Sequence, residues 1–213
     1  MATPSPIISI LSVRKPRTRQ VRPKKASMSA AQLETFLRAA KAHGAREYAM
    51  FLFGFAHGAR ASEICNLRLS DVNFKNEQVH IARLKGSLDS TQGLLKVKGN
   101  GLFDEKAALR AWLAVRKPDA NDYVFNSQKS CRLNRVTVWK LFSAIARASG
   151  LPETHCHPHV LKHSCAMAMV RNGTQAFAIK QHLGHRSFDS TLQYIEVSDV
   201  DASAAFAKAC STF

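Results

Sequence analysis

Apolar residues recur with the spacing of an α-helix over most of the chain. Residues 29–32 read S-A-A-Q, which is a capping box, and Leu33, Phe36 and Leu37 follow it, so we expect a first helix that ends near Ala42. The apolar, aromatic-rich residues 47–56 predict a second helix that is buried on almost every face. The pattern predicts further helices at residues 105–115, 136–149, 161–171, 175–183, 190–195 and 202–209.

A short stretch between these helices has the two-residue period of a strand. Residues 79–83 read V-H-I-A-R and alternate apolar and polar positions, residues 84–92 are polar, and residues 94–97 form a second short apolar run. We expect the two apolar runs to pair as a small hairpin. The predicted fold class is therefore mainly α with a small antiparallel β-sheet, an α+β fold.

The charge of the chain indicates nucleic acid as a partner. A length of 213 residues and an apolar fraction of 46% suit one domain with a real core, whereas a net charge of +16 and a pI near 10.1 are extreme for a globular protein. The phosphate backbone of nucleic acid is the simplest partner for such a surface. The sequence has no apolar run of about 18 residues that would span a membrane. We therefore expect no membrane partner and a cytoplasmic, nucleoid-associated protein.

Positive charge is concentrated before the first helix. Residues 1–26 carry no acidic side chain and contain Pro16 and Pro23. Such a run repels itself and stays disordered until it meets an anion. We expect a basic disordered arm that follows DNA phosphates, and a solubilising tail is the alternative. The positive residues are Arg14, Lys15, Arg17, Arg19, Arg22, Lys24 and Lys25.

The cysteines do not form a disulfide framework. They are five in number and widely scattered, which fits a reducing cytoplasm. A cluster of imidazoles with one thiol at residues 155–163 raises a zinc hypothesis. Pro158 interrupts this cluster, and its spacing lacks the paired arrangement of structural zinc sites, so we expect no metal there. The cluster consists of His155, Cys156, His157, His159 and His163.

Three short motifs and a tyrosine supply groups that suit attack on a phosphodiester. Residues 58–63 read G-A-R-A-S-E and place an arginine at the expected start of a helix, where side-chain and backbone donors together could grip a phosphate. Residues 159–163 read H-V-L-K-H, and residues 183–185 read L-G-H. Cleavage builds negative charge on the oxygens around phosphorus, and cationic donors stabilise that charge. Each histidine or tyrosine alone would more often be a core residue, but the joint spacing of these residues favours a catalytic role. The groups are Arg60, His159, Lys162, His185 and Tyr194.

This ordered set resembles the tyrosine recombinase (phage integrase) family, over residues 27–194. The signature of that family is an early arginine in G-x-R-x-S-E, a lysine in a strand turn, H-x-x-R, L-G-H and a late tyrosine. The turn sequence R-L-K-G-S and the sequence H-P-H-V-L-K-H-S-C further resemble the small recombinases that invert fimbrial promoter switches. The resemblance implies a tyrosine recombinase catalytic-domain fold, and it implies DNA cleavage and rejoining without metal, ATP or another cofactor.

The resemblance also implies a role for each residue. Arg60, His159 and Lys162 would hold the scissile phosphate, and His185 would donate another hydrogen bond. Tyr194 would attack and leave a 3′-phosphotyrosyl link. A lysine in the hairpin turn would protonate the 5′ oxygen. Lys85 is the preferred residue for this role, and Lys96 and Lys98 are its competitors.

Partners and domain limits follow from the same resemblance. Double-stranded DNA would be the substrate, the chain would associate with itself into a tetramer on paired DNA sites, and accessory DNA-bending proteins would be further partners. Residues 27–197 would form the catalytic DNA-cleaving domain. Residues 198–213 would form a C-terminal tail helix that is exchanged between protomers.

One residue departs from the family pattern. Lys162 stands where the family has the second arginine, in H-x-x-R, and a lysine brings one compact charge on a flexible stem instead of a planar fork. Loss of one comparable transition-state donor costs on the order of 3 kcal/mol, or about a hundredfold in rate. We therefore expect a slowed recombinase. A catalytically weak or inactive DNA-binding regulator or accessory protein of the same fold is the alternative, and a relaxing type IB topoisomerase, which shares the chemistry, is less favoured.

Two further expectations concern residues near these motifs. Glu63 should be a buried carboxylate that orders the turn carrying Arg60. Arg132, Arg135 and Lys140 flank the start of the helix expected at residues 136–149, where arginine side chains could read guanine edges in the major groove. A solvated basic face is the alternative for these three residues.

Overall fold

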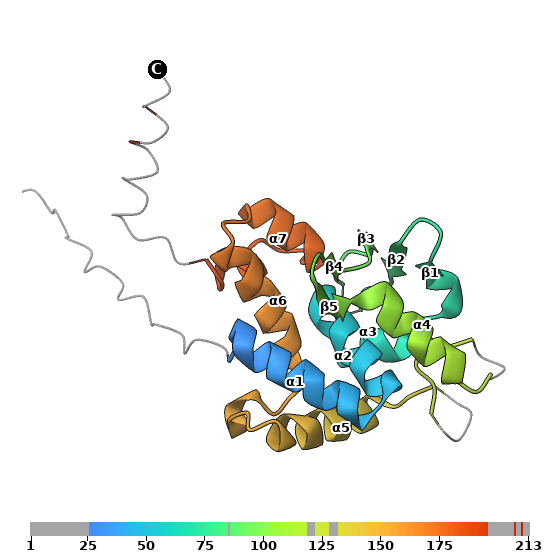
Figure 1. The fold of residues 1–213 in the computed structure, drawn as a ribbon. Coiled ribbons are helices and arrows are strands. Elements are labelled where there is room, and N and C mark those ends of the chain that lie inside the picture. The colour runs from blue at the N-terminus through green and yellow to red at the C-terminus, as the bar shows by residue number, and fades with distance from the viewer. Residues whose placement is uncertain are drawn as a thin grey trace, which may run out of the picture.

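The computed structural model describes residues 26–84, 86–118, 122–127 and 132–195, together with Ala207 and Cys210. Within these residues helices predominate, and two small antiparallel sheets lie beside them (Figure 1). The predicted fold class, mainly α with a small antiparallel sheet, is confirmed. Residues 1–25 of the basic arm, Lys85 and most of the tail at residues 198–213 lie outside the described part of the chain.

Helix α2 (Ala45–Ala56) is the centre of the fold. Its residues 47–54 are all buried, because apolar and aromatic side chains face every direction around the helix. Helices α1 (Ala30–His43), α4 (Glu105–Val115) and α6 (His159–Arg171) pack around it (Figure 1). The rings of Phe36, Phe51 and Phe142 meet with centroids between 4.6 and 5.5 Å apart, so α5 (Arg135–Ala148) shares this core.

Side-chain caps set the starts of several helices. The Gln32 N–H donates to Ser29 Oγ at 3.2 Å, and the Ser29 N–H donates to Gln32 Oε1 at 2.9 Å, so the predicted capping box is confirmed. Asp104 accepts the Ala107 N–H at 2.9 Å at the start of α4, and Asn134 accepts the Val136 N–H at 2.9 Å at the start of α5. These bonds satisfy N–H groups that have no partner within the helix.

The sheets correct one prediction. Strand β2 (Gln78–Ile81) lies between β1 (Val72–Asn73) and β3 (Ser90–Gly93). The hairpin partner expected at residues 94–97 is wrong, because β4 (Lys96–Val97) pairs with β5 (Asn100–Asp104) in a second sheet. The polar residues of β3 predict a turn. They form a strand instead, because their side chains find hydrogen-bond partners in the fold. Gln92 Nε2, for example, donates to the His182 carbonyl at 2.7 Å, which allows a polar strand to lie inward.

Short helices bring the motif residues to the end of α2. Helix α3 (Ala61–Asn66) follows Arg60, α7 (Ala176–His182) precedes the L-G-H turn, and α8 (Asp189–Leu192) precedes Tyr194. Single 3₁₀ turns at Leu69–Asp71 and Glu153–His155 complete the connections. In the part of the chain that the structure describes, no helix is long and apolar enough to cross a membrane.

Candidate active site

The G-A-R and L-G-H turns pack directly against each other. Gly58 follows the end of α2 with a φ of +54°, and a Cβ there would lie 2.5 Å from Leu183 Cδ2. A larger residue would therefore strain the backbone and collide with the L-G-H turn. Gly184 has a φ of +65°, and a Cβ there would lie 2.7 Å from the carbonyl oxygen of Leu88. The two glycines thus allow three segments of the chain to meet closely.

Glu63 holds Arg60 in place. Arg60 is the N-cap residue of α3, and the buried Glu63 carboxylate accepts its backbone N–H at 2.9 Å and its Nη1 at 2.7 Å. The same Nη1 donates to Ser87 Oγ at 3.1 Å, in the loop that carries Lys85. The Arg60 side chain remains 23% exposed, so part of it reaches the surface. The expectation that Glu63 orders the turn beside Arg60 is confirmed.

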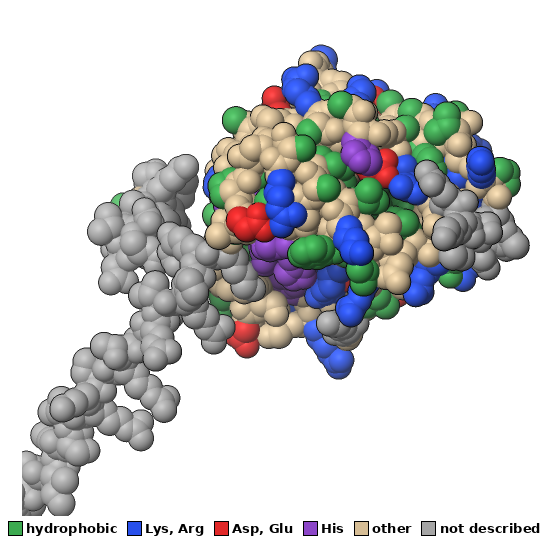
Figure 2. All heavy atoms as spheres, turned by 90° about the horizontal axis from the view of Figure 1, so that it is seen from below, with side chains coloured by type: hydrophobic (Ala, Val, Ile, Leu, Met, Phe, Trp, Pro, Cys, Tyr) green, Lys and Arg blue, Asp and Glu red, His purple; other side chains and the backbone are tan. Residues whose placement is uncertain are grey.

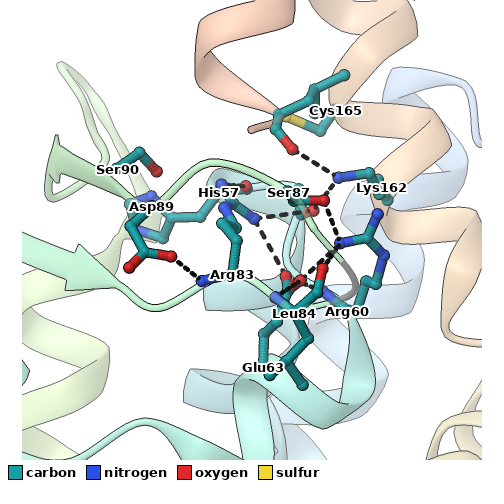
Figure 3. Close-up of polar contacts among 12 residues, drawn as sticks. His57, Arg60, Glu63, Arg83, Leu84, Ser87, Asp89, Ser90, Lys162 and Cys165 are labelled. Atoms are coloured by element: carbon teal, nitrogen blue, oxygen red, sulfur yellow. Dashed lines mark hydrogen bonds and ion pairs between the residues drawn. The ribbon is translucent and has the colours of Figure 1, made fainter. Parts of the chain in front are cut away.

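A second guanidinium, that of Arg83, meets the same carboxylate (Figure 3). Its side chain is fully buried, and its Nη1 donates to Glu63 Oε2 at 3.2 Å. Its Nη2 donates to the carbonyl oxygens of His57 and His182, both at 2.8 Å. Burial alone would raise the pKa of Glu63, but the hydrogen bonds from Arg60 and the charges of both arginines outweigh it and lower that pKa. Arg83 therefore ties the end of α2 to the end of α7 directly, and it pairs with the charged carboxylate on α3 at the same time.

A buried polar layer continues from Arg83 towards the sheets. The His57 ring lies between Gln92 Oε1, 2.7 Å from its Nδ1, and Glu105 Oε1, 2.9 Å from its Nε2. Gln92 Nε2 shares the His182 carbonyl with Arg83 Nη2. Because these buried polar groups bond to one another, they can remain within the core and hold the turns in one arrangement.

Lys162 reaches into the site from α6 (Figure 3). It is buried, and its Nζ donates to the carbonyl oxygens of Gly58 at 3.1 Å and Leu183 at 2.9 Å, so it bridges the two packed turns. Burial, followed by the charges of Arg83 and Arg60, lowers the pKa of Lys162 to about 7. An ammonium has three N–H donors, and two of them are used here. The expected role of Lys162 as a phosphate ligand stays a prediction.

The phenol of Tyr194 lies among histidines. Its Oη is 2.6 Å from Nδ1 of His163, and its ring centroid is 6.4 Å from that of His185, with the planes 8° apart. The ring of His159 meets that of His163 edge-on, with centroids 5.2 Å apart. Burial, then Cys165, raises the pKa of Tyr194 to about 12, while the charge of Arg60 acts in the opposite direction. The phenol is therefore protonated at neutral pH and in contact with an imidazole.

A threonine on α8 orients His185. The hydroxyl of Thr191 lies 2.9 Å from His185 Nδ1, and both residues are buried. The stacked arrangement of His185 and Tyr194 is thereby fixed by a contact between the L-G-H turn and the helix that precedes the tyrosine.

The chain matches a known protein family over most of its length. The model of the phage integrase family matches residues 26–200 of the chain. The chain belongs to the phage integrase family. Among curated members, it is 38% identical over 168 residues to the type 1 fimbriae regulatory protein FimB of Escherichia coli strain K12, which covers 76% of this chain and 80% of the relative. It is 30% identical over 157 residues to FimE of the same strain, which covers 72% of this chain and 75% of the relative.

Solved structures of recombinases share the fold. The XerA recombinase superimposes with a TM-score of 0.70 and 26% identity, over 86% of this chain and 64% of its own. The XerH recombinase in its pre-cleavage complex with difH substrate superimposes with a TM-score of 0.72 and 20% identity, over 88% of this chain and 55% of its own. The chain thus spans less than two thirds of either recombinase. The predicted tyrosine recombinase catalytic-domain fold is confirmed.

The structure gathers five of the six residues that the family resemblance indicates, and Lys85 lies outside the described residues. The loop that carries Lys85 is anchored at the site, because the Leu84 N–H donates to Glu63 Oε1 at 3.2 Å and the Leu84 carbonyl accepts Arg60 Nη1 at 3.4 Å. Lys96, which competes with Lys85 for the role of the acid, lies on β4, and its Nζ pairs with an aspartate of β5 at 3.6 Å. The five gathered residues are Arg60, His159, Lys162, His185 and Tyr194.

Two residues of this phage integrase-family site, His163 and Arg83, are absent from the sequence-based set, and each has a signal that could reveal it. His163 is four residues after His159, which places both on one face of a helix. Arg83 continues the alternation of the buried residues Val79 and Ile81, so the period of a strand points its side chain inward.

The zinc hypothesis finds no support in the described part of the chain, where no group of three or more His, Cys, Asp or Glu residues could hold a metal ion. Two members of the cluster at residues 155–163 contact separate partners outside it. His155 Nε2 lies 3.2 Å from the Ser27 carbonyl oxygen, whereas His163 contacts Tyr194.

Proposed function

We propose that this chain is a site-specific DNA recombinase that cuts and rejoins DNA through a 3′-phosphotyrosyl intermediate at Tyr194. The observation that carries the proposal is the position of Tyr194 Oη, 2.6 Å from His163 in the site that holds Arg60 and His185 of the same chain. Family membership supports it, and a relative from Thermococcus onnurineus, 30% identical over 155 residues, is named tyrosine recombinase XerA.

The charges at the site suit the chemistry. Attack by Tyr194 builds negative charge on the oxygens of phosphorus, and the guanidinium of Arg60, on a side chain that is 23% exposed, can donate to them. His159 and His185 are further donors, and Lys162 adds positive charge behind them. Lys85, on the loop anchored at Glu63, protonates the 5′ oxygen. The phosphotyrosyl link conserves the energy of the broken phosphodiester, so rejoining needs neither ATP nor metal.

Double-stranded DNA is the proposed substrate, in keeping with the net charge of +16. Figure 2 shows lysine and arginine side chains spread over one face of the molecule, with histidine side chains gathered among them. Arg132 and Arg135 lie at the start of α5, and Val136 and Trp139 on that helix are 50% and 49% exposed. This end of α5 therefore offers both charged and apolar groups to base edges in the major groove.

Assembly belongs to the same proposal. The chain forms a tetramer on paired DNA sites, and residues 198–213 are exchanged between protomers. Accessory DNA-bending proteins are further partners. Residues 1–26 follow DNA phosphates, and residues 27–197 cleave the DNA. The protein works in the cytoplasm on the nucleoid. The support for these statements is the family membership and the strongly basic sequence.

The test is the recovery of protein-linked DNA from expressing cells under denaturing conditions, followed by sequencing of the attached ends. We expect adducts at one sequence from the native chain and none from Tyr194→Phe. Tyr123→Phe is the matched control, because the Tyr123 ring lies against Arg68 outside the site and should leave the adducts unchanged. A larger yield from Lys162→Arg would show that the lysine limits the chemistry.

A catalytically weak or inactive DNA-binding regulator of the same fold is the second candidate. One observation favours it, because Lys162 replaces the usual arginine and directs its Nζ to two backbone carbonyls. DNA binding without any adduct, from both the native chain and Lys162→Arg, would establish this regulator in place of the recombinase.

A further inference from the structure

We infer that His163 is a catalytic residue that accepts the phenolic proton of Tyr194 as that side chain attacks phosphorus. The inference deepens the proposed function and rests on it. His163 Nδ1 lies 2.6 Å from Tyr194 Oη. Tyr194 Oη is the atom that forms the new bond, and the distance is that expected between a reacting hydroxyl and its general base.

The surroundings of the pair make a proton acceptor necessary. His163 and Tyr194 are only 6% and 8% exposed, so bulk water has little access to the phenol. Burial raises the pKa of Tyr194 to about 12, so the phenol must lose its proton during the attack. Histidine is the side chain best suited to take a proton near neutral pH, since its ordinary pKa is about 6.5.

Helix α6 fixes the ring of His163 in position. The neighbouring residues Val160, Leu161 and Ser164 are buried in the core. Ser164 Oγ donates to the Val160 carbonyl at 2.8 Å and accepts the N–H of Met28 at 2.8 Å, which locks this turn of the helix to the start of the domain. The ring of His159 packs edge-on against this imidazole. A base held this firmly needs no reorganisation before the reaction.

The proposed step balances in atoms and charge. The O–H bond of Tyr194 breaks, its proton passes to Nδ1 of His163, and the phenolic oxygen bonds to phosphorus. The bond from phosphorus to the 5′ oxygen breaks, and Lys85 protonates that oxygen. Nothing is oxidised or reduced. In the rejoining step the 5′ hydroxyl gives its proton to the neutral amine of Lys85 as it attacks phosphorus. The bond from phosphorus to the Tyr194 oxygen breaks, and the imidazolium of His163 returns its proton to that oxygen.

The experiment compares His163→Asn, His163→Ala and the native chain on a synthetic duplex of the sequence recovered with the native adduct. An asparagine amide can hydrogen-bond the phenol from nearly the position of Nδ1, but it cannot accept the proton. Each protein is assayed on the ordinary duplex and on one with a 5′-bridging phosphorothiolate, whose thiolate leaves without protonation. Lys85→Ala reports on the leaving-group acid, and His43→Asn, at the exposed end of α1, is the matched control.

We expect His163→Asn to slow adduct formation on the order of a hundredfold on both duplexes, as removal of a general base does. The phosphorothiolate should restore Lys85→Ala and leave the His163 variants slow. Added imidazole should accelerate His163→Ala, which distinguishes a lost base from a lost packing contact.

Three results would overturn the inference. They are a His163→Asn rate within threefold of native, restoration of that variant by the phosphorothiolate, and a His163→Ala variant that imidazole does not accelerate. In each of them the native chain still forms its Tyr194-dependent adduct, so the proposed function survives. Failure of the native chain to form that adduct would overturn the proposed function itself, and the inference with it.

Discussion

Arg83 and Arg60 bind the same carboxylate, yet their replacement by methionine should have different effects. Methionine keeps an unbranched apolar stem and removes the guanidinium. The Arg83 side chain is fully buried, whereas that of Arg60 is 23% exposed. We expect Arg83→Met to lower the free energy of unfolding strongly. We expect Arg60→Met to abolish DNA cleavage with a small loss of stability.

The magnitude follows from the contacts of Arg83. Its removal takes donors from Glu63 and from the carbonyls of His57 and His182. Loss of one partner of a buried ion pair costs roughly 3–5 kcal/mol. Arg60 still neutralises Glu63 at 2.7 Å, and Arg83 Nε is buried without a hydrogen-bond partner, so the loss belongs at the lower end. We expect about 3 kcal/mol for Arg83→Met and about 1 kcal/mol for Arg60→Met.

Urea denaturation followed by circular dichroism measures these losses. With a slope of about 2 kcal/mol per molar urea, the midpoint of Arg83→Met should fall by about 1.5 M. Arg38→Met is the matched control, since the Arg38 side chain is 70% exposed and its ion pair with Glu34 spans 3.9 Å. Its midpoint should move by less than about 0.5 M. Equal midpoints for Arg83→Met and Arg38→Met would refute the view that the buried guanidinium holds the turns together.

Three other predictions concern charge. The pKa of Lys162 is lowered to about 7 in the folded chain and is near 10.4 in the unfolded chain. Between pH 7 and about 7.5 the unfolded chain therefore binds the extra proton, while its thiols, with an ordinary pKa of about 8.5, remain mostly protonated. The free energy of unfolding should therefore rise with pH by up to about 1.4 kcal/mol per unit, and a rise just as steep in Lys162→Met would contradict this assignment. Glu63→Gln leaves the guanidiniums of Arg60 and Arg83 without their counter-charge. Urea denaturation should therefore show that the free energy of unfolding falls by about 3 kcal/mol, and the adduct yield should drop at least tenfold. Native values in both assays would rule out this role of Glu63. Deletion of residues 1–26 should weaken DNA binding and flatten its dependence on salt in a titration, and an unchanged slope would exclude contact between the arm and phosphates.

The helices of this chain could be predicted because local signals determine them. Helix α4 has the predicted bounds, since Asp104 caps its start and apolar residues recur along one face. Strand β3 could not be predicted, because the partners that let its polar side chains lie inward come from elsewhere in the chain. His57 and His182 are 35 and 90 residues away from Gln92, which they contact. Sequence periodicity cannot show such partners.

The residues of the site also divide into those that the sequence predicts and those that only the structure reveals. Motif spacing indicates Arg60, His185 and Tyr194, because these positions follow a pattern along the chain. The contact between His163 and Tyr194 joins residues 31 positions apart, and it depends on how α7 and the L-G-H turn, which lie between α6 and α8, fold back. The direction in which the Lys162 side chain points likewise depends on packing, since the carbonyls that its Nζ contacts belong to two turns far from it in the sequence. Only the three-dimensional arrangement reveals these relations.

Tyr194 and the groups around it belong to a single chain. Each subunit of an assembly would therefore own all of the reactive groups that the structure describes at the site. Neighbouring subunits would then control cleavage through the position of Tyr194. A neighbour could hold Tyr194 away from His163 or allow the contact to form. A mixed assembly of Arg60 and Tyr194 variants would contain no complete set, so two such defects could not complement each other.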